Sequence, residues 1–435
     1  MLPDPALTFT VPSIHDGTTL DCRVYHPASL QANPHAPPWR RHAAVLAHPY
    51  APMGGCYDDP VLEVIAARLL REGYLVGTFN FRGAGHSAGK ASWTSKPERE
   101  DYASVIGFLV YYIHLLDPFG HPQATEEHQA TSATSNPTSP NRHGDNADAQ
   151  AIEPVFIIGG YSYGAVTTTH LPPLSAILET FASPASHSNA AQIRLRAESL
   201  AEQQNIMLAV ARQEFLEMHS PSSPVRRGLR IGGDEGGSPR PSTDSIGRKS
   251  LSRDMEEKFH GIVAKTRSSL HIHRHNHSHG SGAELGKAKE TEPAEPAEGK
   301  LPAIPKLLMP RVAYLLVSPL PGLATHLVTM TLLPTALSRP KNPAEDPLEA
   351  KLIQNPTLAV YGECDSFVTT HKARSWVARL SSAPASLFEG IEVASAGHFW
   401  AEEGVLHEMV SAVGDFASSL IQVDTVHDGH GNEGI

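Results

Sequence analysis

Runs of consecutive apolar residues alternate along the chain with stretches in which apolar residues recur at helical spacing. An uninterrupted apolar run is typical of a strand buried on both faces of a mostly parallel sheet, and recurrence every three or four residues predicts an amphipathic helix. The pattern predicts strands over 7–11, 19–26, 43–48, 75–81, 155–159, 312–317, 357–361 and 388–393. It predicts helices over 60–72, 98–116, 166–171, 190–219, 372–380 and 405–420. Because strands and helices alternate, we expect an α/β fold with a mostly parallel sheet flanked by helices.

Polar stretches interrupt this alternation. Residues 121–152 and 220–300 lack an apolar period and can bury little surface, so we expect both to be disordered insertions. The expected organisation is an N-terminal half of one domain (1–120), the first insertion (121–152), a central segment (153–182), a helical insertion (183–219), the second insertion (220–300), a C-terminal half (301–422) and a tail (423–435). The helical insertion either forms a lid over a site or packs on the domain surface.

Composition and charge favour a soluble protein that does not bind nucleic acid. The 435 residues include 35 Lys and Arg against 46 Asp and Glu, a formal net charge of −11, and no large basic patch. Cys22, Cys56 and Cys364 are too far apart for a disulfide framework or a metal site, which is typical of a reducing compartment. The first residues do not form a signal peptide pattern, and no apolar run is long enough for a membrane span. We therefore expect a cytoplasmic protein.

A histidine-rich tract lies inside the second insertion. Five histidines alternate with other residues over 271–279. Such a tract can bind a transition metal loosely, but no carboxylate or cysteine within it defines a coordination geometry. We expect a solvated tract, and the sequence implies neither a metal nor an organic cofactor.

The motif Gly-Tyr-Ser-Tyr-Gly over 160–164 is the strongest chemical signal in the chain. It follows a predicted strand and precedes a stretch that can form a helix until Pro172 and Pro173 end it. Strand, G-x-S-x-G and helix in this order are typical of a nucleophile elbow, in which a serine lies on a sharp turn with its hydroxyl exposed. The two glycines let neighbouring backbone and side chains pass close by. Ser162 is therefore the candidate nucleophile.

Asp365 and His398 each follow a predicted strand further along the chain. Ligands bind beyond the carboxyl ends of the strands in an open parallel sheet, so these residues and Ser162 are expected to meet at one edge. A serine hydroxyl needs a base to take its proton, and a carboxylate on the other ring nitrogen of the histidine fixes its tautomer. The sequence thus predicts a Ser-Asp-His triad, with Glu363 as the alternative acid.

Two backbone N–H groups are expected to form an oxyanion hole. One belongs to Tyr163, directly after the nucleophile. The other belongs to the loop after the strand over 43–48, where two prolines have no N–H; this leaves Tyr50 or Ala51, and we favour Tyr50. His48 is interpreted as shaping this loop, with a direct catalytic role as the alternative. Arg82 is expected to tie down its own loop through hydrogen bonds to carbonyls, with binding of a substrate carboxylate as the alternative.

Five motifs together resemble a known family. They are His-Pro and Gly-Gly in the loop over 48–55, Phe-Asn-Phe-Arg-Gly-Ala-Gly-His-Ser over 79–87, the elbow over 160–164, the acid motif over 362–368 and Gly-His-Phe over 397–399. In these motifs the chain resembles the α/β-hydrolase superfamily, and within it the dienelactone-hydrolase-like and predicted-esterase branch. The resemblance covers about residues 40–120, 153–175, 310–335 and 355–420.

The triad and the resemblance lead to one functional hypothesis and two alternatives. The leading hypothesis is a serine hydrolase that cleaves an ester, thioester or similar acyl bond of a small molecule through an acyl-enzyme. One alternative is a catalytically lapsed hydrolase fold that acts as a scaffold through the insertion over 220–300. The other keeps the triad but uses it as an acyltransferase or a peptidase. The sequence does not indicate an oligomeric state.

Overall fold

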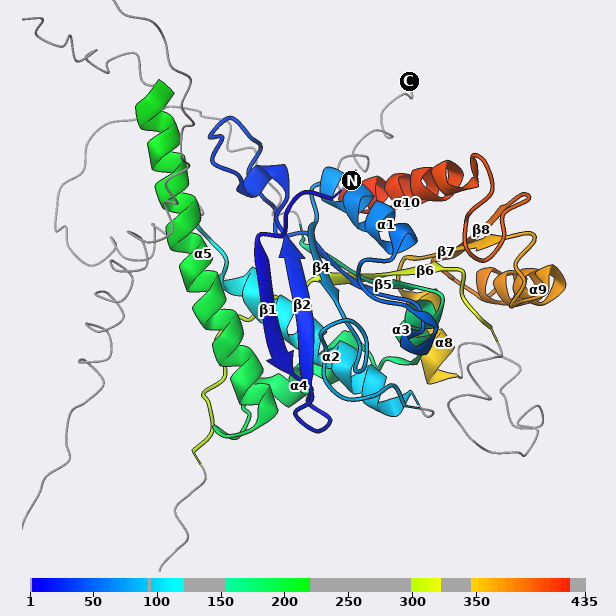
Figure 1. Ribbon diagram of the computed structural model, residues 1–435, viewed down its shortest axis with the longest axis horizontal. Helices are drawn as coiled ribbons and strands as arrows, with labels where there is room; N and C mark the ends of the chain where they lie inside the picture. The colour runs from blue at the N-terminus through cyan, green and yellow to red at the C-terminus, as the bar shows by residue number, and fades with distance from the viewer. Residues whose placement is uncertain (1, 93–94, 121–152, 220–298, 322–345, 423–435) are drawn as a thin grey trace, which may run out of the picture. The chain divides into compact units, whose positions relative to one another are not determined.

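Eight strands in the described part of the chain form one sheet, in the order β1-β2-β4-β3-β5-β6-β7-β8 (Figure 1). The strands are β1 (Leu7–Pro12), β2 (Thr19–Tyr25), β3 (Ala43–Ala47), β4 (Leu75–Phe79), β5 (Val155–Tyr161), β6 (Arg311–Val317), β7 (Thr357–Gly362) and β8 (Phe388–Val393). The computed structural model describes residues 2–92, 95–120, 153–219, 299–321 and 346–422. All of these belong to one compact unit.

The sheet is parallel except at its N-terminal edge. β2 pairs with β1 and β4 in antiparallel register, and every other pairing from β4 to β8 is parallel. β3, β4, β5 and β7 are buried along their whole length, as their continuous apolar runs predict. The parallel strands therefore end at one common edge, and the mostly parallel sheet expected from the sequence is confirmed.

Helices cover both faces of the sheet. They are α1 (Pro60–Arg71), α2 (Lys96–Leu115), α3 (Tyr163–His170), α4 (Leu174–Ala182), α5 (Asn189–His219), α8 (Pro347–Gln354), α9 (Thr370–Ser381) and α10 (Val405–Gln422), with short 3₁₀ turns η1 (Ala28–Leu30) and η2 (Ala51–Met53). Side chains of α1 and α10 share one apolar cluster with one face of the strands. The other face shares a second cluster with side chains of α2, α4, α5, α8 and α9.

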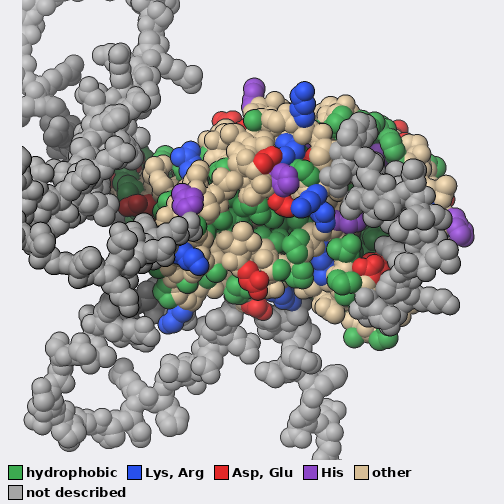
Figure 2. Space-filling view, turned by 90° about the horizontal axis from the view of Figure 1, so that it is seen from below, with side chains coloured by type: hydrophobic (Ala, Val, Ile, Leu, Met, Phe, Trp, Pro, Cys, Tyr) green, Lys and Arg blue, Asp and Glu red, His purple; other side chains and the backbone are tan. Residues whose placement is uncertain are grey.

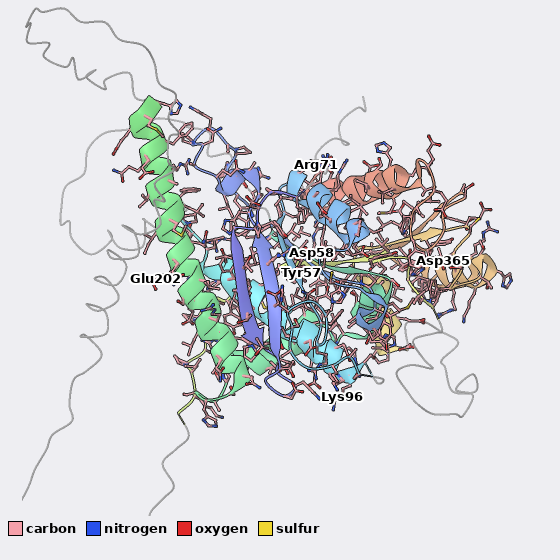
Figure 3. All side chains as sticks on the ribbon, in the orientation of Figure 1. Tyr57, Asp58, Arg71, Lys96, Glu202 and Asp365 are labelled. Carbon is pink, nitrogen blue, oxygen red and sulfur yellow. The ribbon has the colours of Figure 1, made fainter. Side chains whose placement is uncertain are left out.

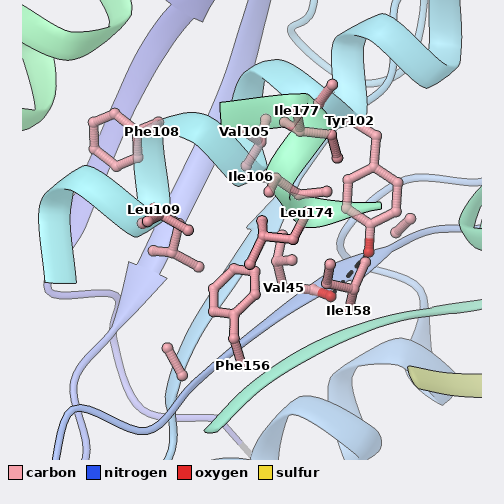
Figure 4. Close-up of a cluster of buried hydrophobic side chains, with 14 of the residues drawn as sticks. Val45, Tyr102, Val105, Ile106, Phe108, Leu109, Phe156, Ile158, Leu174 and Ile177 are labelled. Atoms are coloured by element: carbon pink, nitrogen blue, oxygen red, sulfur yellow. Dashed lines mark hydrogen bonds between the residues drawn. The ribbon is translucent and has the colours of Figure 1, made fainter. Parts of the chain in front are cut away.

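Within the apolar cluster that includes α2, one tyrosine hydroxyl forms hydrogen bonds to two neighbouring strands (Figure 4). The Tyr102 side chain from α2 is fully buried, and its hydroxyl lies 3.0 Å from the carbonyl oxygen of Val45 and 2.6 Å from that of Gly159. The rings of Phe79 and Phe81 pack against it, with centroids 5.0 Å and 6.3 Å from that of Tyr102. A buried hydroxyl needs such partners, and here they hold α2 over the junction of β3 and β5, at the residue directly before the elbow motif.

Two helices were not expected from the sequence. α4 begins directly after Pro172 and Pro173, which end α3 but also suit the start of a new helix. The N-cap of α8 is Asp346, whose side chain accepts a hydrogen bond from the backbone N–H of Leu348, and Pro347 takes the first helical position. An Asp N-cap followed by proline is a helix start signal, so α8 could have been found.

The helix α5 packs on the domain surface beside α2, β1 and α4 (Figure 1). Its first half buries small and aliphatic side chains such as Ala197 and Leu200. The Asn205 side chain then donates to the carbonyl of Leu115 at the end of α2, and beyond this point the helix exposes Ile206 and Val210. These contacts pack the first half of the helix on the domain surface.

The structure describes the chain again from Gly299, at the end of the range expected for the second insertion. Lys300 forms an isolated bridge with Ala185, and the Ser186 N–H donates to the carbonyl of Gly299 at 2.8 Å. These backbone hydrogen bonds tie the chain to the segment before α5. The remaining expectations of disorder (121–152, 220–298 and the tail 423–435) and the histidine tract over 271–279 lie outside the described residues.

Most of the exposed large apolar side chains in the described chain lie in two regions. Figure 2 shows hydrophobic side chains interspersed with charged ones on one face of the molecule. One region is the C-terminal half of α5. The other consists of loops beyond the carboxyl ends of strands, with Met53 after β3, Phe367 after β7 and Phe399 after β8. Among the described helices none is both long and apolar enough to cross a bilayer. The described residues contain no cluster of three or more His, Cys, Asp or Glu suited to a metal ion.

Candidate active site

Ser162 lies on a sharp turn between β5 and α3. Its backbone has φ 55° and ψ −114°, a region that residues other than glycine rarely adopt. A Cβ at Gly164 would lie 2.1 Å from the carbonyl oxygen of Ala47 at the end of β3, and a Cβ at Gly160 would lie 2.4 Å from the carbonyl carbon of Gly164. Only glycine fits at both positions, so the elbow can press directly against the neighbouring strand.

The structure brings Ser162, His398 and Asp365 into one hydrogen-bonded chain. The Ser162 Oγ lies 2.8 Å from the His398 Nε2, and the His398 Nδ1 lies 2.7 Å from the Asp365 Oδ2. A carboxylate can only accept, so Nδ1 carries the proton and Nε2 presents its lone pair to the serine hydroxyl. The His398 and Asp365 side chains are 2% and 4% exposed, so water hardly competes for these bonds.

The carboxylate of Asp365 is oriented by its own loop after β7 (Figure 3). Its second oxygen, Oδ1, accepts hydrogen bonds from the backbone N–H groups of Phe367 at 2.7 Å and Val368 at 3.2 Å. Glu363, the alternative acid, instead accepts from the Ser395 N–H and lies 3.7 Å from Arg374. Asp365 is therefore the carboxylate that contacts the histidine.

The two residues expected to form the oxyanion hole lie side by side. Tyr163 is the first residue of α3, and the first N–H groups of a helix have no acceptor within the helix. The rings of Tyr50 and Tyr163 are 5.1 Å apart between centroids. The Tyr50 carbonyl accepts from the N–H groups of Met53 and Gly55, which curls the loop after β3 back on itself.

Comparison with known proteins gives similarities among solved structures alone. No protein-family model matches the chain, and no curated protein sequence matches it. An α/β serine hydrolase homologue from Coxiella burnetii is 12% identical with a TM-score of 0.39, covering 95% of this chain and 99% of that one. An α/β serine hydrolase without a lid from Xanthomonas campestris is 13% identical with a TM-score of 0.40, covering 97% and 98%. An esterase from Pyrococcus furiosus is 11% identical with a TM-score of 0.40, covering 95% and 92%.

Similarity at this level does not define the fold. The strand order, together with the positions of the site residues after the strands, does. A β1-β2-β4-β3-β5-β6-β7-β8 sheet carries an elbow serine after β5, an aspartate after β7 and a histidine after β8. The chain has the α/β-hydrolase fold. The fold class expected from the sequence is confirmed, and the dienelactone-hydrolase-like branch stays a prediction.

Within this α/β-hydrolase fold, the backbone of His398 is held by a residue of the elbow strand. The hydroxyl of Tyr161, directly before Ser162, donates to the His398 carbonyl at 2.9 Å. The Ser318 hydroxyl lies 3.4 Å from the same carbonyl and accepts from the Trp400 Nε1 at 3.0 Å. Burial raises the pKa of Tyr161, so its hydroxyl keeps its proton and remains a donor. This link fixes the histidine relative to the nucleophile.

His48 links the loop after β3 to the loop after β4 through hydrogen bonds to their backbone. Its Nε2 accepts from the backbone N–H of Phe81 at 2.9 Å, so Nδ1 carries the proton and donates to the Pro49 carbonyl at 2.5 Å. Burial lowers the pKa of His48 to about 4, which leaves the ring neutral at pH 7. Both ring nitrogens are engaged with backbone, and this arrangement suits a loop-shaping role.

Arg82 ties down its loop, but its partners are not the carbonyls expected from the sequence. Its guanidinium binds carboxylates rather than carbonyls, with Asp101 Oδ1 at 2.7 Å and Asp16 Oδ2 at 2.9 Å. Asp101 is fully buried on α2, and its Oδ2 also accepts from the Arg82 backbone N–H. The buried guanidinium needs these charges, and they anchor the loop after β4 to α2 and to the β1–β2 turn.

Sequence reasoning missed Tyr161, Ser318 and Trp400. Tyr161 stands inside the G-x-S-x-G motif at a variable position, where the motif gives no reason to single it out. Ser318 and Trp400 have φ of 45° and 55°, and such backbone is a feature of the folded chain rather than of its residue types. Tyr161 is the one with a usable signal, because a buried strand-end tyrosine needs a hydrogen-bond partner for its hydroxyl.

Proposed function

We propose that the protein is a serine hydrolase that cleaves an acyl bond of a small-molecule substrate, as a carboxylesterase or thioesterase does. The observation that carries the proposal is the unbroken hydrogen-bonded chain from Ser162 through His398 to Asp365, which starts at a nucleophile elbow. Three residues in this order and geometry have the roles of nucleophile, base and orienting acid in acyl transfer.

The proposed reaction has two halves. The Ser162 Oγ attacks the acyl carbonyl carbon while its proton passes to the His398 Nε2, and the resulting imidazolium is stabilised by Asp365. The tetrahedral intermediate then expels the alcohol or thiol, which leaves with the proton from Nε2, and the acyl group stays on Oγ. In the second half, water gives a proton to Nε2 and attacks the acyl carbonyl carbon. The second tetrahedral intermediate then expels Ser162 Oγ, which takes the proton back from Nε2, and the acid is released.

The oxyanion of each intermediate needs donors that are already in place. We assign this role to the backbone N–H groups of Tyr163 and Tyr50, whose side chains pack against each other. Such donors stabilise the negative charge where it develops, and losing one typically costs about 100- to 1000-fold in rate. The contact of Gly164 with the end of β3 brings the loop that carries Tyr50 close to the elbow.

The first test is covalent labelling of the serine. Wild type should react with a fluorophosphonate probe, and Ser162→Ala should not. Ser366→Ala is the matched control, because Ser366 is an exposed serine one residue after Asp365, and this variant should label like wild type. A folded wild-type protein that takes up no probe would overturn the proposal and favour the scaffold alternative.

The second test is turnover of p-nitrophenyl esters with graded acyl length. We expect hydrolysis by wild type and none above background by Ser162→Ala. Asp365→Asn should lower kcat by about 10⁴-fold, because the amide favours the wrong histidine tautomer. Product analysis with added alcohol or amine acceptors separates a hydrolase from an acyltransferase or a peptidase.

A further inference from the structure

Two exposed phenylalanines flank the imidazole of the candidate base. Phe367 is 39% exposed and Phe399 is 60% exposed, whereas most large apolar side chains in the described chain are buried. The ring centroid of Phe367 lies 4.4 Å from that of His398, and that of Phe399 lies 5.3 Å from it. The two phenylalanine rings are 5.9 Å apart in an edge-to-face arrangement. The imidazole therefore has an apolar aromatic rim that is open to solvent.

The backbone of both phenylalanines is linked directly to residues of the candidate triad. The N–H of Phe367 donates to Asp365 Oδ1, so its position depends on the acid itself. Phe399 is covalently next to His398, and its loop is held by the carboxylate of Glu402, which accepts from the Gly397 N–H at 3.0 Å. The backbone of neither residue can shift far without moving a residue of the hydrogen-bonded chain. The aromatic pair is thus built into the site rather than being an incidental surface feature.

The chemistry of acyl transfer determines which part of a substrate meets these rings. The departing oxygen takes its proton from the His398 Nε2, so the alcohol part of an ester has to lie against the imidazole as it leaves. The acyl part is held on the serine side by the oxyanion donors. Side chains that border the imidazole are therefore within reach of the alcohol part.

We propose that Phe367 and Phe399 form a binding site for the alcohol part of the substrate and select esters whose alcohol carries a bulky apolar or aromatic group. The proposal rests on the proposed function, since it assigns His398 as the acid that protonates the leaving group. Burying an apolar group against two aromatic rings is favourable, and edge-to-face contacts add to this. A small or strongly polar alcohol gains little from the same surface.

The test compares two esters of one acid whose alcohols have similar acidity but different bulk. The two substrates are the ethyl and 2-phenylethyl esters of butyric acid, and the released acid is measured by titration at constant pH. We expect wild type to favour the phenylethyl ester by about 10- to 100-fold in kcat/KM. Phe367→Ala and Phe399→Ala should each lower this preference about 5- to 20-fold, and Phe399→Leu should lie between alanine and wild type.

The preference is a ratio of two substrates on one variant, so a general loss of triad efficiency cancels from it. Leu387→Ala is the control, because Leu387 is also exposed, at 53%, but lies in the turn before β8. The Leu387→Ala variant should show the same preference between the two esters as wild type. A wild-type ratio near one, or a ratio unchanged in both alanine variants, overturns the inference. If wild type hydrolyses neither ester and takes up no fluorophosphonate, the proposed function itself fails.

Discussion

Replacing Gly164 by alanine is expected to disable the site without altering a triad side chain. The added Cβ would lie 2.1 Å from the carbonyl oxygen and 2.6 Å from the carbonyl carbon of Ala47, whereas unstrained contacts are about 3.5 Å. The elbow or the end of β3 therefore has to move by roughly 1 Å. Because Ser162 lies on one side of this contact and the Tyr50 loop on the other, we expect kcat to fall on the order of 100-fold. The overpacking should also cost about 1–3 kcal/mol of unfolding free energy.

The assay compares wild type, Gly164→Ala and a glycine control outside the site. In Gly299→Ala the added Cβ would meet the exposed hydroxyl of Ser186 at 3.3 Å, a contact that a shift of a few tenths of an ångström relieves. We would measure kcat and KM for a p-nitrophenyl ester, the rate of fluorophosphonate labelling and unfolding in urea. The control should match wild type in all three. A Gly164→Ala protein with wild-type kcat and wild-type stability would refute the reasoning.

Three more substitutions test other contacts. Tyr161→Phe removes the hydroxyl that donates to the His398 carbonyl, so kcat should fall about 5- to 50-fold with KM nearly unchanged, and an unaltered kcat would contradict the positioning role. Asp101→Asn leaves the buried Arg82 guanidinium short of one charge, and urea unfolding should show a loss of about 3 kcal/mol. Burial lowers the pKa of Lys351 to about 7, so between about pH 7 and 10 the unfolded state binds a proton that the folded state lacks, and stability should rise with pH. From about pH 7 to 9, wild type should gain about 2 kcal/mol relative to Lys351→Met in chemical denaturation, and a difference independent of pH would contradict this assignment.

The strands and the candidate triad were accessible from the sequence for the same physical reason. A strand buried on both faces has to be an apolar run, and the polar residue that follows it stands at the carboxyl edge of the sheet. This places Ser162, Asp365 and His398 at one edge before any coordinates are known. The sequence favoured Asp365 but left Glu363 open, because both belong to one loop and only its turn decides which carboxylate faces the imidazole.

Contacts between distant segments were not accessible in this way. Arg82 pairs with Asp101 and with Asp16, which stand 19 and 66 positions away in the sequence. Either carboxylate has a sufficient local explanation, since Asp101 lies near the start of a helix and Asp16 in a turn. Only the packing of α2 against the β1–β2 turn shows that the two share one guanidinium.

The close approach of Gly164 to β3 and the open position of Phe367 and Phe399 have a consequence for how this chain can evolve. The elbow tolerates no side chain at its glycines, so relatives with the same chemistry should keep them unchanged. Phe367 contacts Asp365 through its backbone N–H rather than its side chain, and Phe399 is joined to His398 by a peptide bond. Residues at 367 and 399 can therefore change identity while the acid and the base stay in place. If the two rings bind the alcohol as proposed, selection for a new alcohol can act on these two positions while the three hydrogen-bonded residues stay unchanged.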